Sequence, residues 1–142
     1  MSKGLKGIML TVGGLAVFIA LGGGGFAWWV SAHSAELTAE AERVEAEGAA
    51  HGAGNDSNTC LSAGIVRLRS CDTRVCRVKA TIFLRGCLST AKSSPEFCDG
   101  VPRPGGFDTV TWRVKRCKAV VIEPKKCQEY FEAMQVHCHP KR

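Results

Sequence analysis

The segment that decides the fold, residues 60–87, reads CLSAGIVRLRSCDTRVCRVKATIFLRGC. Cys60 and Cys71 are eleven residues apart, as are Cys76 and Cys87, and eleven residues make about three turns of α-helix. Each pair therefore lies on one helical face. The two pairs are also symmetric about the turn between Cys71 and Cys76, as antiparallel helices require. We expect a helical hairpin with one bridge, Cys71–Cys76, near the turn and another, Cys60–Cys87, at the open end.

The other four cysteines continue this pattern. Cys127 and Cys138 are again eleven residues apart, and Cys117 and Cys127 flank a second turn. The natural bridges of a second hairpin are Cys117–Cys127 across the turn and Cys98–Cys138 near the open end. Residues 59–142 are therefore expected to form a small all-α domain of two disulfide-stapled helical hairpins.

Apolar side chains recur at helical spacing in four segments of this domain. Ile65–Arg69 also alternates as a strand would, but the cysteine period favours helix. Candidate N-caps are Ser57 or Asn58, Asp72, and Asp108. The expected helices are Thr59–Ser70, Thr73–Ala91, Thr109–Ile122 and Pro124–Cys138.

The cysteine usage also bears on chemistry and compartment. Eight cysteines without a Cys-x-x-Cys pair favour structural bridges over zinc, haem attachment or a redox site. Bridges persist in oxidising compartments. The sequence contains no convincing arrangement of nucleophile and base and no phosphate-binding glycine loop, so we expect neither an enzyme nor a bound cofactor.

The first hairpin resembles the twin-cysteine hairpins of the CHCH family, in which two Cys-x9-Cys helices are joined by two disulfides in oxidising spaces beside membranes. Here each spacing is one residue longer, Cys60-x10-Cys71 and Cys76-x10-Cys87. The second hairpin is a further departure from the family pattern. The resemblance implies a role in scaffolding or assembly.

The N-terminal region reads as a membrane anchor. Residues 8–30 carry no charged side chain and are long enough to cross a bilayer. Lys3 and Lys6 precede this span and acidic residues follow it, so residues 1–7 are expected in the cytoplasm and the cysteine domain on the other side. Ala16, Ala20 and Gly24 form a small-residue stripe on which another membrane helix could pack.

A cleaved signal peptide is the alternative, because Val30, Ser31 and Ala32 provide small residues at a possible cleavage site. The protein would then be secreted. The length of the apolar run and the Trp28–Trp29 pair favour an uncleaved anchor.

Between the anchor and the cysteines the chain is acidic. Residues 31–47 are expected to form a solvated helical stalk, and residues 48–58, rich in glycine and polar residues, a flexible linker. Residues 31–59 hold six acidic residues and one Arg, whereas residues 60–142 hold 16 Lys and Arg against seven Asp and Glu. The sequence thus places a basic module on an acidic tether.

Basic residues border both hairpins and predict a surface for anionic lipid, anionic glycan or an acidic protein, although a merely solvated face is the simpler interpretation. Nucleic acid is disfavoured by the compartment. The residues of this predicted basic surface are Arg67, Arg69, Arg74, Arg77, Arg113, Arg116, Lys125 and Lys126.

The segment His137-Cys138-His139 is the only suggestive chemical cluster. Two imidazoles and a sulfur can hold copper or zinc. Consecutive helical residues point about 100° apart, however, so His137 and His139 are more simply two histidines beside a bridged cysteine. A metal site there is the weaker alternative.

Together these features predict a non-enzymatic, single-pass envelope protein that acts as a scaffold, accessory subunit or adaptor for a protein partner. A metal- or thiol-handling role, or binding of anionic lipid or glycan, is the alternative. We expect the bacterial inner membrane, with the domain in the periplasm, over the mitochondrial inner membrane facing the intermembrane space.

Overall fold

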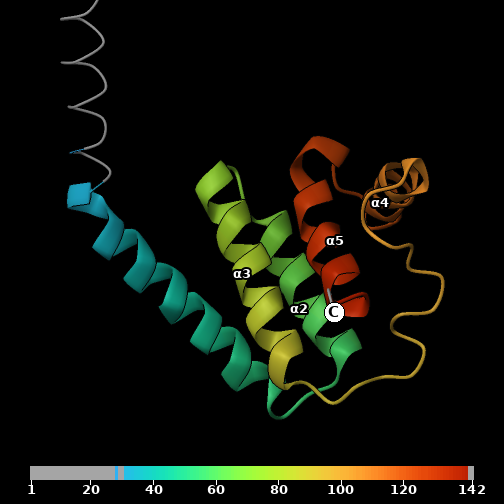
Figure 1. Cartoon of the computed structure of the whole chain (residues 1–142), viewed down its shortest axis with the longest axis horizontal. Coiled ribbons are helices and arrows are strands. Elements are labelled where there is room, and N and C mark those ends of the chain that lie inside the picture. The colour runs from blue at the N-terminus through green and yellow to red at the C-terminus, as the bar shows by residue number, and fades with distance from the viewer. Residues whose placement is uncertain (1–27, 29–30, 141–142) are drawn as a thin grey trace, which may run out of the picture. The chain divides into compact units, whose positions relative to one another are not determined.

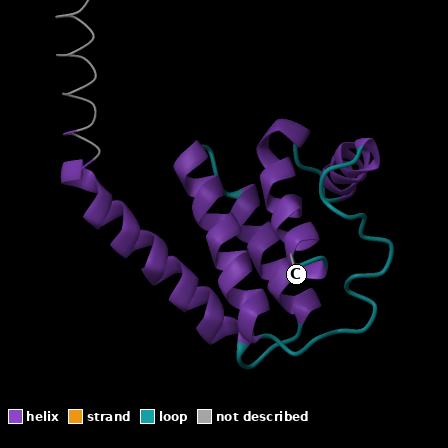
Figure 2. Ribbon diagram, viewed as in Figure 1, coloured by secondary structure: helices purple, strands orange, loops and turns teal. Residues whose placement is uncertain are grey.

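A computed structural model describes residue 28 and residues 31–140, and it confirms the all-α class. Its helices are residues 31–52, α2 (Ser57–Arg69), α3 (Arg74–Thr90), α4 (Phe107–Ala119) and α5 (Pro124–Cys138) (Figures 1 and 2). The described residues contain no strand, only an isolated bridge between Asp56 and Lys92.

The chain divides into two compact units, residues 1–39 and 40–142. The predicted cytoplasmic segment 1–7 and the packing stripe Ala16, Ala20 and Gly24 lie outside the described residues, as does nearly all of the predicted span 8–30. Among the described helices, none combines the length and apolar character needed to cross a membrane.

All eight cysteines form disulfides, and the pairs are those expected from their spacing. Their Cα–Cα distances lie between 5.3 and 5.8 Å. The helix pairs that contact each other are α2 with α3, α3 with α5 and α4 with α5. The disulfides are Cys60–Cys87, Cys71–Cys76, Cys98–Cys138 and Cys117–Cys127.

The helix starts differ from the predicted ones by one or two residues. Asp56, not Ser57 or Asn58, caps α2: its carboxylate accepts from the Thr59 amide at 2.8 Å, and this bond lowers the pKa of Asp56. Ser57 is buried instead, and its hydroxyl donates to the Lys92 carbonyl. The chain between the two hairpins is thereby fixed to the start of α2.

The caps of α3 and α4 also differ from the predicted Asp72 and Asp108. Thr73 caps α3 by accepting from the amide of Cys76 at 3.2 Å. Gly106 precedes α4, and its amide donates to the Thr109 hydroxyl.

The end of α4 comes three residues before the predicted Ile122. Val121 has a positive φ of 57°, and the amides of Val121 and Ile122 donate back to Lys118 and Cys117, both at 3.0 Å. These two bonds form a Schellman motif that terminates the helix. α5 has the predicted bounds.

The prediction of a flexible linker at residues 48–58 is wrong. The helix that begins at residue 31 continues to residue 52, and a short turn then leads into α2. Gly48 and Gly52, which suggested flexibility, are buried within this helix. The acidic segment is therefore joined to the cysteine domain by packed structure.

Glycines allow this helix to approach the backbone of α3 closely. A Cβ atom on Gly48 would lie 2.2 Å from the Phe83 carbonyl oxygen, and one on Gly86 of α3 would lie 2.1 Å from the Glu45 carbonyl oxygen. Val44, on the same helix, is buried. Residues 40–52 thus form a fifth helix of the module, against the expectation of a wholly solvated stalk.

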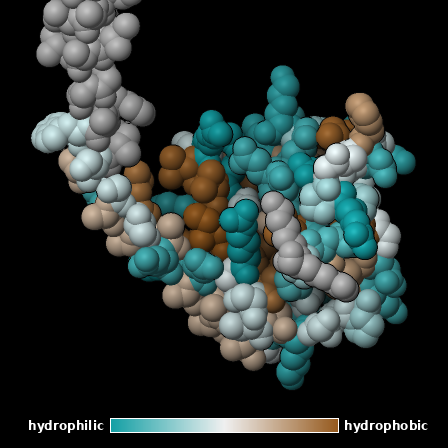
Figure 3. All heavy atoms as spheres, viewed as in Figure 1, coloured by the Kyte–Doolittle hydropathy of each residue, from teal (hydrophilic) through white to brown (hydrophobic). Residues whose placement is uncertain are grey.

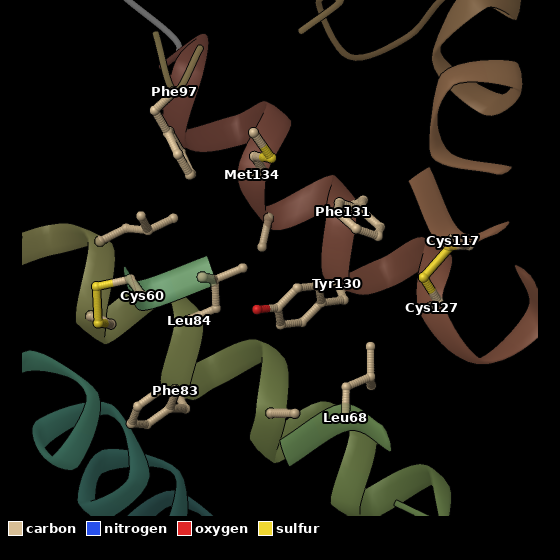
Figure 4. Packing of buried hydrophobic residues seen from close by; sticks show 14 of the residues in the cluster. Cys60, Leu68, Phe83, Leu84, Phe97, Cys117, Cys127, Tyr130, Phe131 and Met134 are labelled. Atoms are coloured by element: carbon tan, nitrogen blue, oxygen red, sulfur yellow. A yellow bond between two sulfur atoms is a disulfide. The ribbon is translucent and has the colours of Figure 1, made fainter. Parts of the chain in front are cut away.

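The core lies between α3 and α5. Leu84 of α3 lies beside Tyr130 of α5, whereas the ring of Phe83 faces the helix of residues 31–52, 5.7 Å from the ring centroid of His51 (Figure 4). Five side chains of the core are at most 2% exposed: Phe83, Leu84, Tyr130, Phe131 and Met134. The helical spacing of Tyr130, Phe131 and Met134 places them on one face of α5. The result is a three-helix contact of α2, α3 and α5, with α4 packed on the other side of α5.

Candidate functional site

The predicted basic surface is largely divided among internal contacts. Arg67 lies over the ring of Phe83, 3.8 Å from its centroid, and also pairs with Glu47 of the preceding helix. Arg69 donates from its guanidinium to the Val120 carbonyl at 2.9 Å. Both side chains therefore connect helices of the module.

In the second hairpin the arginines are also internal. Arg113 is only 13% exposed and pairs with Glu132 at 3.2 Å, while its Nε donates to Gln135. Arg116 lies 5.3 Å from the ring centroid of Trp112, close enough for a cation–π contact.

The remaining members of the predicted surface are more open. Arg74 lies 3.9 Å from Glu129 in a solvent-exposed pair, and Arg77 donates weakly to the Asp72 carbonyl at 3.5 Å. Lys126 lies 3.9 Å from Glu123, whereas Lys125 is exposed without an ion pair among the described residues. The eight basic residues are thus not brought together as one cationic patch.

Charge counting could not separate these roles. The sequence gives the sign of each side chain, but its partner is set by which helices meet. The aromatic residues Phe83 and Trp112 were the sequence signal from which stacking of Arg67 and Arg116 could have been inferred.

Two exposed apolar side chains of α4 were not singled out from the sequence. Phe107, the first residue of α4, is 97% exposed, and Val110 one turn later is 51% exposed. Val114, one turn after Val110, is only partly exposed. Phe107 precedes the predicted helix Thr109–Ile122, so the sequence reasoning placed it on no helix face.

A second apolar area lies on α3. Val75 is 62% and Val78 is 40% exposed, and Ile82 continues their line one turn further. The hydropathy surface shows a hydrophobic patch at the end of α3 that follows the first disulfide-closed turn (Figure 3). Exposed apolar groups that gather on one face are typical of interaction surfaces.

A shallow groove of about 380 Å³ lies between α3 and α5. Leu88, Ala133 and Val136 supply its apolar lining, with Arg85, Ser89 and His137 as its polar groups. Partial burial lowers the pKa of His137, whose ring also contacts Phe97 edge-on.

The two histidines near the C-terminus have separate partners. His137 borders this groove, whereas Nε2 of His139 lies 2.7 Å from the Val101 carbonyl oxygen, and Cys138 is bridged to Cys98. Among residues 31–140 no three side chains of metal-binding type are grouped as a site. The geometry therefore does not favour the metal-binding alternative at His137 and His139.

Comparison of the chain with protein-family models, with curated proteins and with solved structures finds no match.

Proposed function

We propose that this chain is a membrane-anchored, non-enzymatic adaptor of an oxidising envelope compartment, which presents a rigid helical module to a protein partner or to the membrane itself. The observation that carries the proposal is the combination of four disulfides with exposed apolar side chains on two outer helix faces. A fixed surface loses little conformational entropy when it binds.

The disulfides support a binding role through their placement. Two of them close the turns after α2 and α4, and the other two tie α2 to α3 and the segment at Cys98 to α5. Bridges of this kind stabilise a domain of about 80 residues that has only a small core. The apolar residues Val75, Val78 and Phe107 are held on this frame at fixed positions.

The same disulfides support an oxidising location. The bacterial inner membrane with a periplasmic domain fits the uncharged segment 8–30 and the basic residues before it. The mitochondrial intermembrane space, or secretion after signal cleavage, is the alternative. The likeness of the first hairpin to CHCH hairpins supports a role in assembly.

A thiol-handling role is not favoured, because thiol exchange needs a thiolate and all eight sulfurs are bridged.

The proposal is tested on the full-length chain in its native membrane. Membranes are washed with alkaline carbonate, and the protein is alkylated under denaturing conditions without reductant. Retention in the membrane and no added mass on cysteine are expected. A Cys71→Ser variant, which frees Cys76, serves as the positive control for alkylation.

The partner is then sought by crosslinking in mild detergent, comparing the native chain with Val75→Ser and Val78→Ser variants. Loss of a crosslinked band in either variant supports the adaptor role. Release of the native chain by carbonate together with reactive cysteines would contradict it.

A further inference from the structure

We propose that the outer face of α4 binds the surface of a bilayer that contains anionic phospholipid, with Phe107 and Val110 inserted among the headgroups and Lys115 and Lys118 on the lipid phosphates. This proposal rests on the membrane tether of the proposed function and adds a second point of contact to it.

The first argument is the apolar stripe. At 100° per residue, Phe107, Val110 and Val114 fall within about 60° of one another on the helix. Phe107 is 97% and Val110 51% exposed, so the first turn of the stripe is open to solvent. Val114 is partly buried, and Cys117, which follows on the same side of α4, is buried in its bridge to α5.

The second argument is the charge beside that stripe. Lys115 and Lys118 occupy the adjacent face of α4, both are exposed, and neither forms an ion pair within the described residues. Residues 103–126 contain seven Lys and Arg but only two acidic residues, Asp108 and Glu123. An apolar stripe flanked by lysines is the pattern of helices that lie in the interface of an anionic membrane.

The third argument is the position of α4. Of the other labelled helices it packs substantially only on α5, and in Figure 1 it is seen nearly end-on, beyond α5 and away from α2 and α3. Its outer face is therefore open along the helix. A side chain as exposed as Phe107 protrudes from the surface, which suits a deformable headgroup layer.

Membrane lipid is favoured over the other anionic candidates for the same reason. A polysaccharide would use the lysines and leave the apolar stripe in water. An acidic protein would need a cavity shaped for Phe107, and binding to such a partner would not depend on lipid charge.

The test places the full-length chain in nanodiscs of phosphatidylcholine, with or without phosphatidylglycerol, and measures hydrogen exchange of α4 amides. Slower exchange over residues 107–118 is expected only in the anionic discs, and high salt should remove the difference. Equal exchange in both discs would overturn the proposal.

Two variants separate the apolar and the electrostatic contributions. Phe107→Ser and the double variant Lys115→Glu with Lys118→Glu should each abolish the lipid-dependent protection, and circular dichroism should show that both remain folded. Val66→Ser and Lys92→Glu change exposed residues elsewhere and should retain it. Protection that persists in both α4 variants would also overturn the proposal.

Binding of lipid by α4 can also be tested independently of the membrane anchor. If the full-length chain does not integrate into discs, it is added to preformed vesicles of the two compositions, and co-flotation with the anionic vesicles alone still supports the α4 face. If the chain does not integrate into discs but still floats with anionic vesicles, the membrane anchor is contradicted and the lipid-binding face of α4 is supported.

Discussion

The hydroxyl of Tyr130 donates a hydrogen bond to the backbone carbonyl of Leu61 at 2.8 Å, across 69 residues of sequence. The ring of Tyr130 lies directly over Gly64 of α2, where a Cβ atom would meet the hydroxyl oxygen at 2.1 Å. Burial raises the pKa of Tyr130, so the hydroxyl stays protonated as a donor. This contact joins the two hairpins at the core of the module.

Gly64→Ala should therefore destabilise the oxidised chain by about 1–3 kcal/mol, because the new methyl group displaces the ring. Tyr130→Phe should cost about 1 kcal/mol through the lost hydrogen bond. Since the phenylalanine ring leaves room for part of the methyl group, the double variant should cost less than the sum. Thermal unfolding measures all three, and strict additivity would contradict the contact.

Removing disulfides should have unequal effects. Cys98 and Cys138 are 40 residues apart, whereas Cys71 and Cys76 are five apart. The entropy of loop closure assigns about 4 kcal/mol to the long loop and about 2 kcal/mol to the short one. Double replacements by alanine, compared by denaturant unfolding, should keep this order, and a reversed order would count against the pairing.

Replacement of Val121 by glycine should stabilise the chain. It holds a left-handed conformation with φ of 57° while its side chain is 86% exposed, so the backbone is strained without any gain in packing. Val121→Gly should stabilise the chain by about 1 kcal/mol, a rise of several degrees in Tm. Val66→Gly, at an exposed valine within α2, should destabilise it by a few tenths of a kcal/mol. Equal effects at the two sites would argue against strain at Val121.

Larger residues at the glycine contact should release residues 40–52 from α3. Gly48→Leu cannot be accommodated, because the Phe83 carbonyl oxygen lies 2.2 Å from the position of its Cβ. Hydrogen exchange of the 40–52 amides should increase, while the disulfide-bonded helices stay protected. Gly54→Ala, at a position with no atom within 4 Å of the added Cβ, is the control and should change nothing.

Acid should weaken the contact between residues 40–52 and α3. Hydrogen bonds from Arg43 and Lys79 hold the pKa of Glu40 at about 2, against 4.5 without them. Because the folded pKa is the lower one, the stabilisation is complete above pH 4.5 and is lost as the pH falls towards 2. Exchange of the 40–52 amides should rise over this range. Glu40→Gln should reduce the dependence, and the part that remains should come from Glu47, whose pKa is lowered by its hydrogen bond from Arg67.

The cysteine spacing was enough to predict three of the bridges because each lies within one helical hairpin; the fourth, Cys98–Cys138, ties the segment before α4 to the end of α5. A period of eleven residues fixes both the helix and the face on which its sulfurs lie. The bounds of α5 followed from Pro124, which starts a helix without needing a side-chain cap.

The features that were not predicted depend on tertiary contacts, which the composition of a segment does not encode. Glycine can make a chain flexible, and it can also let two backbones pack closely. Gly48 and Gly52 were interpreted as a flexible linker because the sequence alone does not show that α3, with Gly86, packs against them. In the same way, Arg67 and Arg113 count as surface charge until their partners Phe83 and Glu132 are placed. The exposure of Phe107 was missed because the predicted helix began two residues after it.

The four bridges are nested and never cross: Cys71–Cys76 lies inside Cys60–Cys87, and Cys117–Cys127 lies inside Cys98–Cys138. Synthesis begins at the N-terminus, so both disulfides of the first half can form before the cysteines of the second half have been made. Within each half the inner pair is complete before the outer one, because Cys76 is made before Cys87 and Cys127 before Cys138. Cys60 and Cys98 must each pass over two later cysteines to reach their partners, so the inner bridges have to form first.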